Sequence, residues 1–184
     1  MTNPSIDCLT FFEGEPPIEL LRARLSLMVE ANPWLCGRLA SAKKGAVNLW
    51  VPTKGNADSC FSEAKAQGLT AETPILEARK ACDFLGVKLG LQCVDEDLPL
   101  FKVCVLHTGG TQFALLVSLS HVIGDAATFY KLYGMLDPMT EPATLDVSRI
   151  STFTAVAIKG ALGPEAILGH TPLPSSEKKT AMQI

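Results

Sequence analysis

Residues 113–125 read FALLVSLSHVIGD, and this stretch decides which fold the chain is expected to have. The run 113–119 is almost wholly apolar, which is typical of a strand buried on both faces and therefore central in its sheet. After Asp125 the spacing of apolar residues changes from the period of a strand to that of a helix. Because Asp is a preferred N-cap residue, we expect a helix to begin beside Asp125.

The segments on either side of this stretch extend the pattern. Alternating apolar residues at 101–106 predict a second strand, and Gly109–Gly110 supplies the turn between the two strands. The helix after Asp125 is expected to bury one face, formed by Phe129, Leu132, Tyr133 and Leu136. A strand pair followed by an amphipathic helix predicts an α/β fold, with a two-layer mixed sheet and packed helices.

The rest of the chain supplies shorter elements. Apolar residues recur at helical spacing between Pro17 and Pro33, which predicts an amphipathic helix. The apolar residues of this helix are Ile18, Leu21, Leu25 and Met28. The other expected elements are a hairpin of residues 34–39 and 46–51, short helices near 62–67 and 74–81, and a loop or edge strand at 86–97.

Composition and charge exclude several classes of protein. The chain has 184 residues with a formal net charge of −3 and no basic run, so nucleic acid is not an expected partner. Its apolar runs at 113–117 and 155–158 are far shorter than the roughly 20 residues of a membrane span. Residues 1–17 lack the pattern of a secretory signal, so we predict no membrane span and a cytoplasmic location.

The six cysteines show no metal-binding or disulfide pattern. They stand at positions 8, 36, 60, 82, 93 and 104, without any C-x-x-C spacing. We therefore expect free, mostly buried thiols in a reducing compartment.

His121 is the residue on which a chemical role centres, because it stands at the carboxyl end of a central strand. If the strand period continues, His121 shares a face with the apolar residues before it and is partly desolvated, which favours the neutral imidazole that a general base requires. The spacing from His121 to Asp125 arises easily by chance. A structural histidine followed by a capping aspartate therefore remains an alternative.

Three segments resemble the CoA-dependent acyltransferase superfamily, which includes chloramphenicol acetyltransferase, the plant BAHD-type enzymes and the condensation domains of peptide synthetases. Residues 118–125, SLSHVIGD, resemble its His-x-x-x-Asp signature, and residues 30–39, EANPWLCGRL, resemble its P-x-x-x-G-R-L passage. Residues 97–101, DLPLF, are similar to the loop before the penultimate strand of an amino-terminal lobe. In order and separation the three match such a lobe over residues 8–137.

The resemblance implies a reaction and a site. His121 would be the general base that takes a proton from a hydroxyl or amine of a small molecule as this acceptor attacks an acyl-CoA thioester. Asp125 would be mainly architectural, pairing with an arginine and shaping the loop. The expected catalytic residues are thus His121 and Asp125. Acyl-CoA is the co-substrate, with no bound cofactor and no metal, and the fold is one lobe of the chloramphenicol acetyltransferase type.

Two departures from the family pattern stand out. Ala126 occupies a position where the family often has Gly, and the chain is about half as long as the two-lobed members, without their Asp-Phe-Gly-Trp-Gly motif. Single-lobe members carry the motif near the carboxyl end, whereas 59 residues follow Asp125 here. We therefore expect an amino-terminal lobe at 1–170 and a tail or linker start at 171–184, completed by a second lobe or by self-association. A condensation domain would have a second His where this chain has Ser120.

Other kinds of site are weaker alternatives. A serine hydrolase would need Ser118 or Ser120 beside His121, but adjacent strand residues point to opposite faces. Residues 160–163 lack the Lys-Ser/Thr of a phosphate loop. A metal site would have to combine His107, His121, Asp125 and His170, of which only the 121/125 pair has local spacing.

The alternative from another class is a non-catalytic lobe that binds a partner through its exposed apolar surface. Basic residues that would meet CoA phosphates, or that are merely scattered surface charges, are Arg22, Arg24, Lys43, Lys44 and Lys54.

Overall fold

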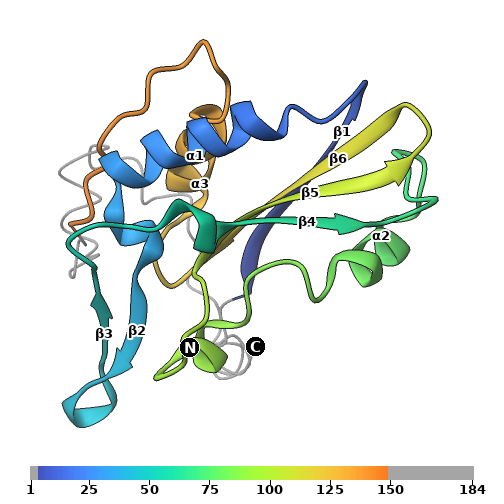
Figure 1. Ribbon diagram of the computed structural model, residues 1–184. Helices are drawn as coiled ribbons and strands as arrows, with labels where there is room; N and C mark the ends of the chain where they lie inside the picture. Colours follow the sequence, from blue (N-terminus) through green and yellow to red (C-terminus); the bar gives the residue numbers. More distant parts are fainter. Residues whose placement is uncertain (1–3, 149–184) are drawn as a thin grey trace, which may run out of the picture. The chain divides into compact units, whose positions relative to one another are not determined.

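The structure is a computed structural model that describes residues 4–148 (Figure 1). Its main sheet has four strands in the order β1-β6-β5-β4. These strands are β1 (Ser5–Glu13), β4 (Phe61–Lys65), β5 (Phe101–Gly109) and β6 (Gln112–Ser120). β6 runs antiparallel to β1 and β5, whereas β4 runs parallel to β5, so the sheet is mixed, as predicted.

β6 occupies the inner position predicted for it. Ser5 lies opposite Ser120 at one end of β6, and Glu13 lies opposite Gln112 at the other. On its second side β6 pairs with β5 along nearly its whole length. Every residue of β6 after Gln112 is buried, because side chains on both faces pack against other elements.

Both edge strands differ from the prediction. A short helix was expected near residues 62–67, and this was wrong, because 61–65 form β4 with alternating burial. β1 was not predicted at all. Edge strands are only half-buried and depend on pairing with residues far away in sequence, so their local pattern is weak. β4 in particular is too short and polar to show a clear alternation.

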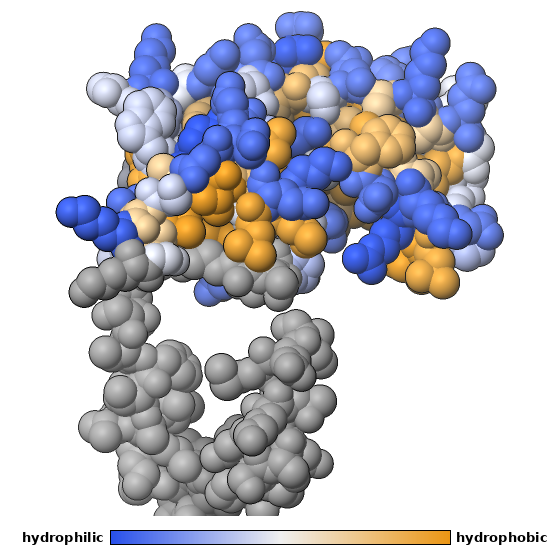
Figure 2. All heavy atoms as spheres, turned by 90° about the horizontal axis from the view of Figure 1, so that it is seen from below, coloured by the Kyte–Doolittle hydropathy of each residue, from blue (hydrophilic) through white to orange (hydrophobic). Residues whose placement is uncertain are grey.

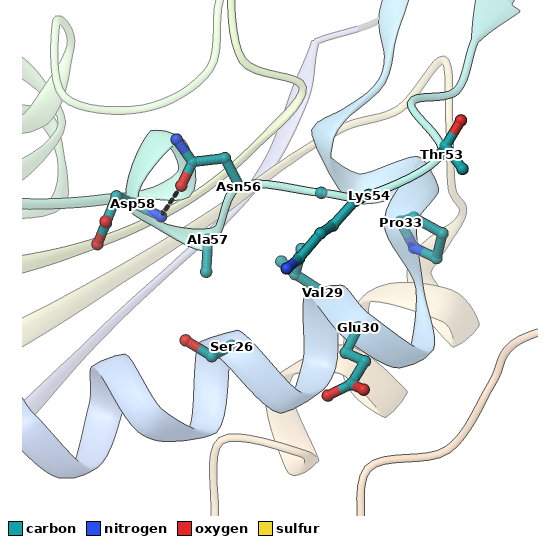
Figure 3. Close-up of a pocket in the computed structure, with 10 residues that line it drawn as sticks. Ser26, Val29, Glu30, Pro33, Thr53, Lys54, Asn56, Ala57 and Asp58 are labelled. Atoms are coloured by element: carbon teal, nitrogen blue, oxygen red, sulfur yellow. Dashed lines mark hydrogen bonds between the residues drawn. The ribbon is translucent and has the colours of Figure 1, made fainter.

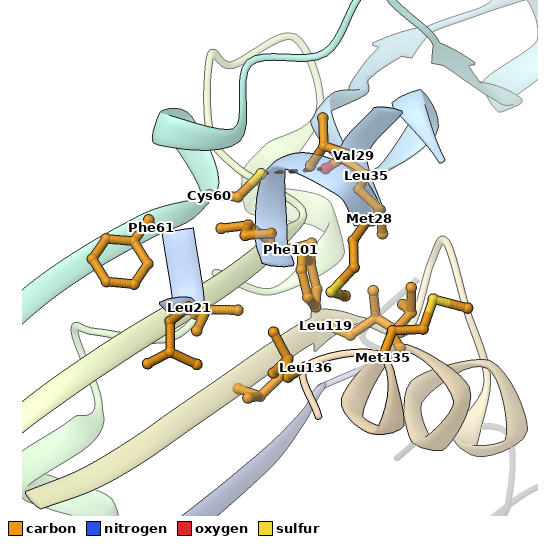
Figure 4. Packing of buried hydrophobic residues seen from close by; sticks show 14 of the residues in the cluster. Leu21, Met28, Val29, Leu35, Cys60, Phe61, Phe101, Leu119, Met135 and Leu136 are labelled. Carbon is orange, nitrogen blue, oxygen red and sulfur yellow. Dashed lines mark hydrogen bonds between the residues drawn. The ribbon is translucent and has the colours of Figure 1, made fainter. Parts of the chain in front are cut away.

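Helices cover both faces of this sheet (Figure 1). α1 (Ile18–Ala31) and α3 (Ala126–Gly134) lie on one face, where their apolar residues pack with those of β5 and β6 in the largest buried cluster. In Figure 4, Met28 of α1 lies near Leu119 of β6 within this cluster. α2 (Ile75–Cys82) packs on the opposite face. All three helices confirm the predicted ones.

A small hairpin stands apart from the main sheet. It consists of β2 (Arg38–Ser41) and β3 (Val47–Trp50), joined by the 3₁₀ turn η2 (Lys43–Gly45). The residues before it form another 3₁₀ turn, η1 (Pro33–Cys36), where the sequence had predicted strand. Gly37 connects η1 to β2. A side chain at this position would clash, because a Cβ there would lie only 2.7 Å from the side chain of Leu49. Further 3₁₀ turns are η3 (Ala57–Cys60) and η4 (Gly90–Cys93).

Two further expectations concern the cysteines and membrane-spanning helices. All six cysteines are free, and four of them, Cys36, Cys60, Cys93 and Cys104, are buried, as predicted. Within residues 4–148, none of the helices has the length and apolar character needed to cross a bilayer.

Candidate active site

His121 lies in a turn rather than on the sheet. β6 ends at Ser120, and the Ile123 amide donates to the Ser120 carbonyl at 3.0 Å, which closes a turn over residues 121–123. The side chain of His121 is therefore exposed to solvent. The expectation that His121 continues the buried face of the strand was wrong, because the strand period stops one residue earlier.

Asp125 is the N-cap residue of α3, as predicted. Its Oδ1 accepts a hydrogen bond from the Thr128 amide at 2.8 Å. That amide holds the pKa of Asp125 below its usual value, and the charge of His121 adds to the effect. The ion pairs formed within residues 4–148 do not include Asp125, so the arginine partner implied by the resemblance is not seen there. Ala126 begins the helix without a positive φ, so the backbone conformation there does not require glycine.

The two residues after His121 anchor its turn. Val122 and Ile123 pack against a buried cluster formed by Leu39, Cys93 and Leu100. η4 approaches this turn so closely that a Cβ at Gly90 would lie 2.3 Å from Val122 Cγ2. Packing on the turn therefore fixes the backbone of His121 while its side chain stays in solvent.

The three segments that resemble the acyltransferases meet around this turn. Arg38 Nε donates to Asp97 Oδ1 at 2.5 Å, which joins the second segment to the third. The Ser120 amide donates to the Leu100 carbonyl at 2.8 Å, which joins the third segment to the strand before His121. Residues 59 positions apart in the first bond and 20 in the second thus form one local structure beside His121.

Two of the basic residues considered as contacts for CoA phosphates, Arg22 and Arg24, have other roles in the structure. Arg24 is buried in α1, and its guanidinium donates to the Met135 carbonyl at 2.8 and 3.1 Å and to the Thr140 carbonyl. It therefore binds the carbonyl end of α3, where a positive charge is favourable. Arg22 pairs with Asp58 at 3.1 Å and lies over the ring of Phe61.

We predict that Arg24→Met destabilises the protein by about 1.5–3 kcal/mol, because carbonyls that accept from a buried cation lose their partner. Urea unfolding followed by circular dichroism measures this loss. Arg22→Met is the matched control and should cost under about 1 kcal/mol, since Arg22 forms exposed ion pairs. Equal losses in the two variants would contradict this role of Arg24.

The alternative sites of the sequence analysis gain no support from the described residues. Ser118 donates to Asp7 and accepts from the Val87 amide at 2.9 Å, so its hydroxyl is already engaged. His107 pairs with Glu63 at 3.0 Å. Nowhere in residues 4–148 do three or more metal-ligating side chains gather. His170 and residues 160–163 lie outside the described residues.

A cavity of about 540 Å³ lies outside the His121 turn, between α1 and residues 53–58 (Figure 3). Ser26, Val29 and Glu30 line it from the helix, and Lys54 reaches in from the loop opposite. The sequence analysis missed this cavity, because small polar residues in a connecting loop show no motif or periodicity.

The fold of this chain also occurs in solved structures. The SgcC5 protein from Streptomyces globisporus superposes with a TM-score of 0.56 at 16% identity, over 76% of this chain and 33% of its own. A condensation domain of the enacyloxin polyketide synthase gives 0.51 at 20% identity, over 79% of this chain and 28% of its own. The chain has the fold of part of a condensation domain. The first condensation domain of the calcium-dependent antibiotic synthetase gives 0.51 at 17% identity, over 72% and 32% of the two chains.

These structures fix the fold class but not the activity of this chain. The chain spans about a third of the length of these three proteins. No protein-family model matches the sequence, and no curated protein matches it. The fold is thus of the mixed α/β, chloramphenicol acetyltransferase-like type that the sequence predicted. Among these solved structures, the condensation domains are examples of it.

Proposed function

We propose that this chain is the amino-terminal lobe, residues 1–170, of an acyltransferase that moves an acyl group from acyl-CoA to a hydroxyl or amine of a small molecule. One observation carries the proposal. His121 is exposed at the end of the inner strand β6, and the three segments that resemble the acyltransferases pack around its turn. An exposed side chain on a firmly packed backbone suits a residue that must meet a substrate.

His121 acts in this proposal as general base. Its neutral imidazole accepts the proton of the acceptor hydroxyl or amine, while the acceptor atom attacks the thioester carbonyl. The carbon–sulfur bond breaks, CoA leaves as its thiolate, and the imidazolium returns the proton to that sulfur. Asp125 positions His121 by starting α3. General-base catalysis of this kind contributes roughly 10²–10⁴-fold to the rate.

Acyl-CoA as the donor has a precedent in the fold. A variant of the starter condensation domain of rhizomide synthetase, with a TM-score of 0.50 and 18% identity, was solved with C8-CoA. This chain covers 28% of that domain. We propose that a second lobe, or a second copy of this chain, supplies the remaining walls of the site.

Titration with C8-CoA, followed by NMR of the histidine rings, tests this site without an acceptor. We expect the His121 signal to shift and the His107 signal to stay. His107 is the matched control because it lies opposite Phe113, at the other end of β6. His121→Gln assigns the signal, and free octanoate shows whether the CoA part is needed. An unmoved His121 signal would contradict an acyl-CoA site on this lobe.

A non-catalytic lobe that binds a partner is the second candidate. The observation in its favour is the exposure of large apolar side chains near α2, with Ile75 at 81%, Leu76 at 70% and Phe84 at 69%. Figure 2 shows hydrophobic side chains at the surface between hydrophilic ones. Under this alternative, partner binding survives His121→Ala, whereas the enzyme loses CoA release.

A further inference from the structure

Two buried thiols lie side by side where two 3₁₀ turns meet. Cys36 ends η1 and Cys60 ends η3, and their Sγ atoms are 3.6 Å apart. Both belong to the largest buried cluster, with Cys36 8% and Cys60 1% exposed. A disulfide needs about 2.05 Å between its sulfurs, so the two atoms would have to approach by roughly 1.5 Å.

The two sulfurs differ in proton affinity because of their contact. A hydrogen bond from the Cys60 thiol lowers the pKa of Cys36, and the neighbouring Ser59 hydroxyl and the charge of Arg38 add to this effect. The same contact, together with burial, raises the pKa of Cys60. Since the thiolate is the nucleophilic form of cysteine, this difference favours Cys36 as the attacking sulfur.

The cavity beside α1 brings solvent close to Cys36. Gly55 and Asn56 line this cavity together with Val29 (Figure 3). A Cβ at Gly55 would lie 3.1 Å from Cys36 Sγ and 2.3 Å from Val29 Cγ1. The backbone of Gly55 is therefore in close contact with the sulfur. Gly55 therefore forms the wall between the cavity and Cys36, and a molecule as small as hydrogen peroxide would approach the sulfur from this side. Cys60 is more deeply buried than Cys36, and in Figure 4 a dashed line joins its thiol to the Leu35 carbonyl.

We propose that Cys36 and Cys60 form a reversible disulfide site that reacts with hydroperoxides. The Cys36 thiolate attacks one peroxide oxygen, the O–O bond breaks, and Cys36 becomes a sulfenic acid as hydroxide leaves. Cys60 sulfur then attacks the Cys36 sulfur, the S–O bond breaks, and the second hydroxide takes up the Cys60 proton. In total two thiols and one hydrogen peroxide give one disulfide and two waters. A dithiol reductant reverses the oxidation.

The cross-link would close residues 37–59, which include the β2–β3 hairpin, into a loop. A disulfide limits the unfolded chain more than the folded one, so the oxidised protein should melt at a higher temperature. We expect the midpoint to rise by about 5–10 °C over the reduced protein. Because Leu39 of this loop packs in the same cluster as Val122, the cross-link also stiffens a support of the His121 turn.

Peptide mapping of the full chain tests the proposal directly. Each of the six cysteines lies in a different tryptic peptide, with Cys36 in residues 25–38 and Cys60 in residues 55–65. The protein is treated with hydrogen peroxide, its free thiols are alkylated, and the digest is read by mass spectrometry before and after reduction. We expect 25–38 and 55–65 to appear as one linked peptide that reduction separates.

Cysteine variants show which residue acts in each of the two steps of the oxidation. Cys60→Ser should abolish the linked peptide and leave Cys36 as a sulfenic acid that dimedone traps. Cys93→Ser is the matched control, because Cys93 is equally buried but belongs to another cluster, and it should keep the link. The proposal is overturned if both peptides of the wild-type chain remain alkylated, or if other cysteine pairs link as fast. Mapping of the wild-type chain decides this even where a variant does not fold.

Discussion

His121→Ala is expected to lower the rate of CoA release from C8-CoA in the presence of an amine or alcohol acceptor by about a hundredfold or more. The loss follows from removal of the group that accepts the acceptor proton. The fold should survive, because the side chain of His121 is exposed and packing depends on Val122 and Ile123. Free CoA is measured by chromatography, since the cysteines of the protein would react with a thiol reagent.

His107→Ala is the control for this experiment, because it removes an exposed imidazole that pairs with Glu63 far from the turn. Its rate should equal that of the wild type. Equal rates for His121→Ala and the wild type would refute the general-base role. Wild-type protein that binds a partner stably and releases no CoA in that complex would favour the non-catalytic lobe.

Asn32→Ala should cause a loss of about 2–4 kcal/mol in the free energy of unfolding. Asn32 is fully buried, and its Nδ2 donates to the carbonyls of Met28 and Ala143 at 3.2 and 2.9 Å. Its Oδ1 accepts from the Leu145 amide at 2.8 Å and from Trp34 Nε1 at 3.3 Å. The substitution removes the hydrogen-bond partner of these groups, which then stay buried without a partner or must be solvated, and either outcome lowers stability. It also frees residues 143–145 from the end of α1.

Chemical denaturation measures the effect, with Asn48→Ala as the matched control. Asn48 is an exposed residue of β3, so its loss should change stability by no more than about 0.5 kcal/mol. Hydrogen exchange gives a second readout, because the Leu145 amide should lose protection in Asn32→Ala alone. If Asn32→Ala is as stable as the control, Asn32 does not hold this segment.

Elements with a strong local pattern were predicted correctly. β5, β6, α1 and α3 bury whole faces, so their apolar residues recur with the period of a strand or helix. β1 and β4 bury less and depend on distant partners. This is why one was missed and the other was taken for a helix.

The candidate site likewise has some features that the local sequence determines and others that only tertiary contacts determine. The sequence by itself determined the order of strand, His121, capping Asp125 and helix, because capping and periodicity are local properties of the chain. Only the tertiary structure decided that His121 is exposed, that Arg24 binds the end of α3, and that Cys36 meets Cys60. These outcomes depend on contacts between residues 24 to 111 positions apart, which local patterns do not encode.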